Sequence, residues 1–312
     1  MAQTHLFDRR FVVVAGKGGV GRTTVAAALA RAATRAGRRV LLAQMDSPDR
    51  LAALMGQPAP IGPDIVDLGA GLWAVNMTPK RALHDYGLMV LRYEAITNAL
   101  FENRAVRGFL GAVPGLDAYA MLGKAWWHTT ETVDGKPRYD LVVVDGPASG
   151  HALKMLTIPR AILDAVPRGP LARDAKAMRE LFDDPRRSAL LVVTLPEELP
   201  ARETATLVKE ARATLKMPLG PLIVNAVPDP RFADPDLGAL LGALAPEPPA
   251  GLGNTLAGAR LLAERRHEAE RVLAVLAINP GLPRVELPRL PVTRLLPEDI
   301  DALAARLADA LA

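Results

Sequence analysis

Short apolar segments rich in β-branched residues alternate along the chain with longer stretches in which apolar positions recur every three to four residues. The short segments predict buried strands, and the longer stretches predict helices packed against them. This order is typical of an α/β fold with a mostly parallel sheet flanked by crossover helices. The predicted strands span 11–15, 39–44, 72–77, 140–145, 189–194, 221–225 and 284–287. The predicted helices span 22–36, 81–102, 104–128, 150–165, 169–184, 200–214, 258–277 and 297–311.

Long helical segments lie on both sides of the predicted strand at 140–145, and they exceed what a crossover connection needs. They predict a helical subdomain that stands off the sheet and is contributed by about residues 79–135 and 157–187. We expect the whole chain, residues 1–312, to form one domain that includes this subdomain. The Pro- and Gly-rich stretch at 243–253 predicts a surface loop.

The composition narrows the chemistry that the chain can perform. It contains no cysteine, which excludes disulfides, a thiol nucleophile and Cys-ligated zinc or iron–sulfur sites. The net charge of +4 comes without a basic tail or an aromatic–basic cluster, so we expect no nucleic-acid partner. The chain shows no apolar run long enough to span a membrane and no secretory signal at its N-terminus. We therefore expect a cytoplasmic protein without an integral membrane segment.

A glycine-rich turn joins the first predicted strand to the first predicted helix and reads Gly16-Lys-Gly-Gly-Val-Gly-Arg-Thr-Thr24. Glycines let backbone N–H groups surround a phosphate, and the helix dipole favours the negative charge. The alternative interpretation is that the glycines only allow a tight turn, which binds no ligand. In this register Thr23 stands where a hydroxyl binds Mg²⁺. The turn predicts ATP or ADP with Mg²⁺, held by Gly16, Gly18, Gly19, Val20, Gly21, Arg22, Thr23 and Thr24.

Lys17 directly follows the first glycine, and in this the motif resembles the deviant Walker A of the family that contains ParA, MinD, nitrogenase iron protein and the ArsA-type ATPases. The resemblance implies a P-loop NTPase fold, ATP hydrolysis and a nucleotide-bridged homodimer in which Lys17 reaches the partner's phosphates. Arg22 departs from the usual lysine. A guanidinium is longer and planar, so we expect nucleotide binding with slow turnover.

Two predicted strands end in aspartates at the edge where open α/β sheets bind ligands. Asp46 follows the strand at 39–44, and the resemblance implies that it orients the attacking water; a helix cap is the alternative. Asp145 ends the strand at 140–145, an arrangement that holds Mg²⁺ in phosphoryl-transfer sites. Lys17, Asp46 and Asp145 are thus the expected catalytic residues, and Thr23 and Asp145 the expected metal ligands.

The segment that follows Asp145 reads Gly-Pro-Ala-Ser-Gly-His151 and resembles the Thr-Ala-Pro-Thr-Gly-His switch of the ArsA and tail-anchored-protein-targeting ATPases. Partition and cell-division relatives lack this histidine, so the segment favours the ArsA branch. Asp49 stands where that branch usually has a histidine. The same resemblance implies that Asn225 contacts the adenine edge and that Pro288 belongs to a loop beside the base.

Missing elements narrow the expected partners. Arsenite-pump relatives bind metalloid through cysteines on two fused halves, and eukaryotic targeting relatives carry a Cys-x-x-Cys zinc clamp, whereas this chain has no cysteine. The expectation that remains is a zinc-free homodimer, which controls an unknown protein partner or an apolar client. Apolar residues in the helical region predict a client groove or, as is more usual for such spacing, a core. These residues are Leu88, Met89, Leu91, Met121, Leu122, Trp126, Trp127, Met155, Leu156 and Met178.

Two other functions stay open from the sequence. The first is a nucleotide-binding interaction scaffold in which Arg22 leaves weak or no hydrolysis. The second is a ParA- or MinD-like positioning ATPase, for which salt-sensitive binding to nonspecific DNA would be the sign.

Overall fold

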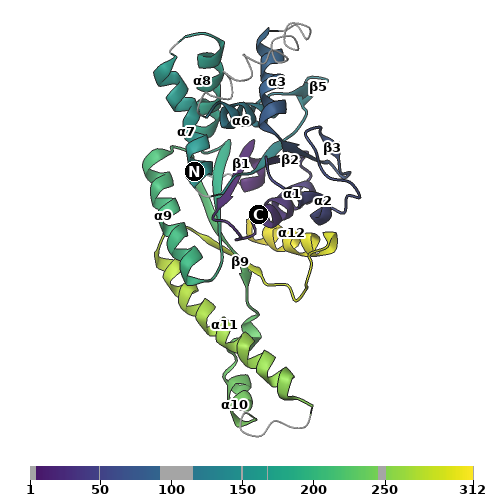
Figure 1. Cartoon of the computed structure of the whole chain (residues 1–312), viewed down its shortest axis with the longest axis vertical. Helices are drawn as coiled ribbons and strands as arrows, with labels where there is room; N and C mark the ends of the chain where they lie inside the picture. The colour runs from purple at the N-terminus through teal and green to yellow at the C-terminus, as the bar shows by residue number, and fades with distance from the viewer. Residues whose placement is uncertain are drawn as a thin grey trace.

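The computed structural model describes residues 5–48, 50–91, 115–148, 150–166, 168–244 and 251–311, and it confirms the α/β class. Its main sheet has eight strands in the order β10-β9-β8-β1-β7-β2-β4-β3, and each pairing is parallel except the one between β3 and β4 (Figure 1). The strands are β1 (Phe11–Gly16), β2 (Val40–Met45), β3 (Val66–Asp67), β4 (Leu72–Met77), β7 (Leu141–Asp145), β8 (Ser188–Thr194), β9 (Leu219–Val227) and β10 (Arg284–Pro288). A separate hairpin pairs β5 (Thr132–Val133) with β6 (Lys136–Pro137).

Most predicted helices lie within a few residues of their expected bounds. Residues 92–114 lie outside the described part of the chain, so only the two ends of the predicted pair at 81–102 and 104–128 are described. None of the described helices is long and apolar enough to cross a bilayer. The helices are α1 (Arg22–Arg35), α2 (Leu51–Leu54), α3 (Pro79–Leu91), α6 (Leu116–His128), α7 (Gly150–Ala165), α8 (Pro170–Asp183), α9 (Glu198–Thr214), α10 (Pro235–Ala243), α11 (Gly253–Ile278) and α12 (Pro297–Leu311).

Helices cover both faces of the sheet. On one face, α1, α2 and α12 bury a core with alternate residues of the central strands. On the other face, α6, α7, α8, α9 and the last turns of α11 bury the remaining alternate residues. In Figure 1 the helices α3, α6, α7 and α8 gather at one end of the molecule, and α10 with the first part of α11 lies at the opposite end.

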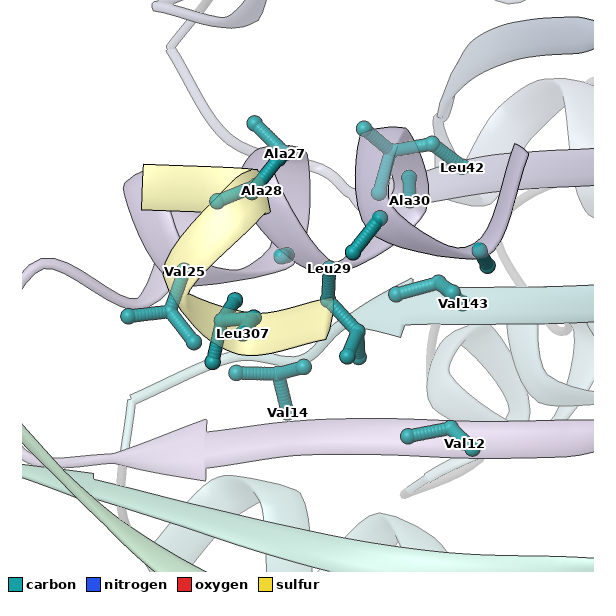
Figure 2. Packing of buried hydrophobic residues seen from close by; sticks show 14 of the residues in the cluster. Val12, Val14, Val25, Ala27, Ala28, Leu29, Ala30, Leu42, Val143 and Leu307 are labelled. Atoms are coloured by element: carbon teal, nitrogen blue, oxygen red, sulfur yellow. The ribbon is translucent and has the colours of Figure 1, made fainter. Parts of the chain in front are cut away.

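Alanines let α1 approach the sheet and α12 closely. Leu29 of α1 and Leu307 of α12 are both fully buried, and Figure 2 places them over Val14 of β1. Burial of each leucine stabilises the fold by about 1.5–3 kcal/mol. This packing fixes the first turn of α1 relative to the end of β1, and the glycine-rich turn that joins them is therefore held at both ends.

Candidate nucleotide site

The glycine-rich turn adopts a conformation that two of its glycines make possible. Gly21 precedes α1 in the left-handed region at φ 86°. A Cβ at Gly21 would lie 2.2 Å from Nδ2 of Asn225, and a Cβ at Gly16 would lie 2.5 Å from the carbonyl oxygen of Val193. Neighbouring groups therefore press on the turn from two sides, and side chains at these glycines do not fit.

We expect Gly21→Ala to lower the free energy of unfolding by about 2 kcal/mol, because the substitution combines a strained φ with displacement of Asn225. Gly18→Ala is the matched control, since its Cβ would meet no atom within 4 Å. Urea unfolding followed by circular dichroism compares the two variants with the wild type. Equal losses of stability in both would contradict this account of the turn.

The first turn of α1 presents free backbone donors to the glycine-rich turn. The first N–H groups of a helix have no carbonyl partner within the helix, and Gly21 has no side chain to cap them. The positive end of the helix dipole adds to their attraction for an anion. The turn and the helix start thus form a cradle with the chemistry that phosphate binding needs.

Thr23 and Asp145, the two predicted metal ligands, lie side by side in the structure. The Thr23 hydroxyl donates to Oδ2 of Asp145 at 2.7 Å, and the Nε2 of Gln44 donates to the same oxygen at 3.4 Å. Burial raises the pKa of the Asp145 carboxyl, although the Thr23 hydrogen bond and the charge of Arg22 act in the opposite direction. Oε1 of Gln44 is buried and has no hydrogen-bond partner within the described part of the chain. The Asp145 carboxylate and the Thr23 hydroxyl therefore meet at one point, and the amide nitrogen of Gln44 approaches the same carboxylate oxygen.

The Thr23 hydroxyl and the Asp145 carboxylate suit Mg²⁺, which prefers hard oxygen ligands and usually keeps several waters. No cluster of three or more His, Asp or Glu residues occurs within the described ranges that could hold a metal by protein ligands alone. Thr23 and Asp145 thus fit a Mg²⁺ ion that takes its other ligands from phosphate and water.

Asp46 directly follows β2, two residues after Gln44, which pairs with Asp145 of the neighbouring strand β7. It is exposed and takes the unusual φ of 39°, while its N–H donates to the carbonyl of Met77 at 2.8 Å. Asn76 holds the next residue, since its Nδ2 donates to the Ser47 carbonyl at 2.8 Å. The carboxylate is therefore presented to solvent on a turn that β4 keeps in place.

Arg22 is half-buried and directs its guanidinium toward the segment after β7. Its Nη1 donates a hydrogen bond to the carbonyl oxygen of Gly146. Burial lowers the pKa of this guanidinium, and the charge of Asp145 raises it in part. Arg22 thus joins the glycine-rich turn to the first residue of the predicted switch segment.

Lys17 forms an ion pair with Glu203 of α9, with Nζ 3.5 Å from Oε1. Both residues line a cavity of about 390 Å³ with His151, which is exposed in the first turn of α7. Asp49 and Ser149, which belong to the predicted switch segments, lie outside the described residues.

Asn225 and Pro288 lie on the adjacent strands β9 and β10. Nδ2 of Asn225 donates to the carbonyl oxygen of Val20 at 3.0 Å, so this side chain supports the glycine-rich turn directly. Pro288 ends β10 opposite Val227, the last residue of β9. The structure therefore places Asn225 against the turn and Pro288 at the end of the neighbouring strand.

Sequence reasoning did not identify Gln44, Asn76 or Glu203 as part of this site. Gln44 is a fully buried polar residue in an otherwise apolar strand, and that signal was present in the sequence. Asn76 lies in the strand beside β2, and Glu203 lies in a helix far along the chain. Their roles depend on the order of the strands and on helix packing, which the sequence did not reveal.

The structure separates core from surface among the apolar helical residues that predicted either a client groove or a core. Four of these residues are buried in the core between the helices and the sheet, where a client could not reach them: Leu122, Met155, Leu156 and Met178. Helical spacing alone could not separate a groove from a core. Trp127 is exposed, and it lines a pocket together with Trp126 and Leu88. The side chains of Met89 and Leu91 lie outside the described part of the structure.

Comparison with known proteins agrees with this arrangement. The family model for anion-transporting ATPases of the ArsA type matches residues 9–168, which include the glycine-rich turn and both strand-end aspartates. This chain belongs to the ArsA ATPase family. The match confirms the resemblance expected from the motifs.

Curated relatives extend the similarity of this ArsA-family chain beyond that segment. ATPase BagA of Mycobacterium tuberculosis is 28% identical over 300 residues, covering 92% of this chain and 88% of the relative. ATPase GET3 of Kluyveromyces lactis is 25% identical over 265 residues, covering 73% of this chain and 74% of the relative. A putative arsenical pump-driving ATPase of Halobacterium salinarum is 29% identical over 213 residues, covering 63% of this chain and 32% of the relative.

Proposed function

We propose that this protein is a slow, Mg²⁺-dependent ATPase in which ATP closes a homodimer and thereby controls a protein partner or an apolar client. The observation that carries this proposal is the 2.7 Å contact between the Thr23 hydroxyl and Asp145 beneath a phosphate cradle. The names of the relatives support ATPase chemistry, since they include an ATPase GET3 and a putative arsenical pump-driving ATPase.

Each residue of the site has a part in this proposal. Backbone donors from Gly16 to Thr24 hold the phosphates of ATP or ADP, and Arg22 adds positive charge beside them. Asp46 accepts a hydrogen bond from the attacking water and orients it toward the γ-phosphate. Positioning and charge stabilisation of this kind account for most of the catalysis in phosphoryl transfer.

Thr23 and Asp145 would hold Mg²⁺ through the hydroxyl and the carboxylate. The ion would neutralise charge on the β- and γ-phosphate oxygens when it is bound. Asn225 keeps its amide on the Val20 carbonyl and so preserves the shape of the cradle. We also propose that Asn225 and Pro288 lie beside the adenine.

Lys17 completes the site across the dimer in this proposal. Its present partner Glu203 lies 3.5 Å away, and both side chains are about one-third exposed. An ion pair as exposed as this one stabilises the protein by only about 0–1 kcal/mol. Lys17 can therefore leave Glu203 at small cost when a partner's phosphates approach.

We expect ATP to promote dimerisation of the wild type and Lys17→Ala to weaken that dimer by about tenfold or more, because a charge-assisted contact to phosphate is lost. Analytical ultracentrifugation with Mg²⁺ and a nonhydrolysable ATP analogue measures this. Lys154→Ala is the control, since Lys154 lines the same cavity and lies outside the glycine-rich turn. Equal dimerisation of the wild type and Lys17→Ala would exclude the contact across the dimer.

A second candidate function rests on Arg22. Its hydrogen bond to the Gly146 carbonyl directs the guanidinium to the backbone of the switch segment. In that position it stabilises a nucleotide-bound scaffold with little hydrolysis. Single-turnover hydrolysis distinguishes the two: a wild-type protein that binds ATP but does not cleave it, and that Arg22→Lys makes active, supports the scaffold.

A further inference from the structure

A pocket of about 820 Å³ lies between α3, α6, α8 and the segment that precedes β3. None of the described residues that line it belongs to the glycine-rich turn, to α9 or to the ends of β2 and β7. Its volume lies in the range of sites that enclose a small organic molecule. Three aromatic side chains, Tyr86, Trp126 and Trp127, form part of its wall.

Three of the four carboxylates that line this pocket within the described residues are less exposed than its arginines. The carboxylates of Asp85, Glu131 and Asp174 are all less than one-third exposed. Lys124 is the one lining cation as buried as these, within the described residues. The other lining cations lie near the surface, with the side chains of Arg81 and Arg173 50% and 76% exposed. Among the described residues, the less exposed side chains of the pocket therefore carry an excess of negative charge.

Two of the three interior carboxylates already have close donors. Lys124 donates to Asp85 at 2.6 Å, and Nδ1 of His128 lies 2.7 Å from Glu131. Both distances are short, as is typical of charge-assisted hydrogen bonds. The third carboxylate, Asp174, is different.

Asp174 is the most buried of these carboxylates, with a side chain only 8% exposed. Its contacts within the described residues are long: Nε of Arg173 lies 3.4 Å away and the Tyr86 hydroxyl 3.5 Å away. Hydrogen bonds at these distances are weak, so the cost of removing the carboxylate from water is poorly offset. A positively charged group in the pocket would supply the missing interaction.

A second polar group in the wall has an unsatisfied atom. His128 is buried, and its Nε2 has no hydrogen-bond partner among the described residues, while its other ring nitrogen faces Glu131. Buried polar groups in folded proteins are normally paired, and exceptions call for an explanation such as a ligand. Asp174 and His128 line the same pocket.

We propose that this pocket binds a hydrophobic organic cation, with Asp174 as its counter-charge and the aromatic side chains enclosing its apolar body. Aromatic faces attract cations, and desolvation strengthens that attraction. An apolar peptide would leave the buried carboxylate without a counter-charge, and an anion would face the interior acids. The inference goes beyond the proposed ATPase, because binding here requires neither nucleotide nor a dimer.

Two probes of nearly equal shape and opposite charge test the proposal: tetraphenylphosphonium and tetraphenylborate. The full chain without nucleotide is titrated with each, and tryptophan fluorescence is the readout. Two of the three tryptophans line the pocket. We expect the phosphonium to bind at least about tenfold more tightly than the borate. Equal binding, or tighter binding of the borate, would overturn the proposal.

Substitutions then locate the binding. Asp174→Asn is expected to weaken phosphonium binding by about tenfold and to leave borate binding unchanged or tighter. Glu180→Gln, on the exposed side of the same helix, should change neither. Trp127→Leu gives an independent test on an exposed residue, and it should weaken phosphonium binding by about threefold and borate binding less. Unchanged phosphonium affinity in a folded Asp174→Asn protein, or in Trp127→Leu, would contradict the assignment.

Discussion

Asp46→Asn lowers the single-turnover rate of ATP hydrolysis about 100-fold and leaves nucleotide affinity almost unchanged. The amide has the shape of the carboxylate, but its oxygen is a weaker acceptor for the hydrogen bond that the attacking water donates. Asparagine also tolerates the left-handed φ of 39° at this position. The backbone turn and the Asn76 contact to Ser47 are therefore preserved, and the loss reports on water positioning.

Arg22→Lys is the matched comparison for this experiment. A lysine supplies the same charge near the phosphates, so we expect turnover equal to or higher than that of the wild type. Rates from quenched-flow measurement with enzyme in excess over ATP compare the two variants directly. Hydrolysis by Asp46→Asn at the wild-type rate would show that another group positions the water.

Asp145→Asn is expected to reduce hydrolysis by at least about 100-fold and, in buffer with EDTA, to raise the Tm at neutral pH. The first effect follows from loss of a carboxylate beside Thr23. The second follows because burial raises the pKa of Asp145 in the folded protein, so the ionised form is disfavoured there. An uncharged side chain of the same shape removes that cost.

The pH dependence of the Tm follows with a definite sign. A raised pKa means that the folded state holds the proton more tightly than the unfolded chain. Wild-type stability is therefore lost as the pH rises from the ordinary value for aspartate through the raised value in the fold. The advantage of Asp145→Asn should be largest at neutral pH and should shrink as the pH falls toward about 4. A Tm equal to that of the wild type across this range would contradict the assigned cost of burial.

Local sequence signals predicted the parts of the structure that depend on local chemistry. The strand, glycine turn and helix start from Phe11 to Thr24 are contiguous, so periodicity and glycine content were enough. The end of β7 at Asp145 was equally clear from its apolar run. The two-residue strands β3, β5 and β6 are too short to show any period.

Other features depend on contacts between distant segments. Helix α10 was not predicted, because Pro235–Ala243 contains two glycines and shows little amphipathic pattern. The hydrogen bond from Asn225 to Val20 joins residues 205 positions apart and exists because β9 lies two strands from β1. The long contact between Tyr86 and Asp174 joins α3 to α8, 88 positions along the chain. No pattern along the chain encodes such distances.

Calorimetric titration with ATP and with ADP, each in the presence and absence of Mg²⁺, tests most directly whether this chain is a nucleotide-driven ATPase. The cradle at Gly16–Thr24 and the Thr23–Asp145 pair predict binding of both nucleotides below about 1 mM, with ATP tighter when Mg²⁺ is present. No heat of binding for either nucleotide at millimolar concentration, from protein shown to be folded, would contradict the proposed function and its scaffold alternative together.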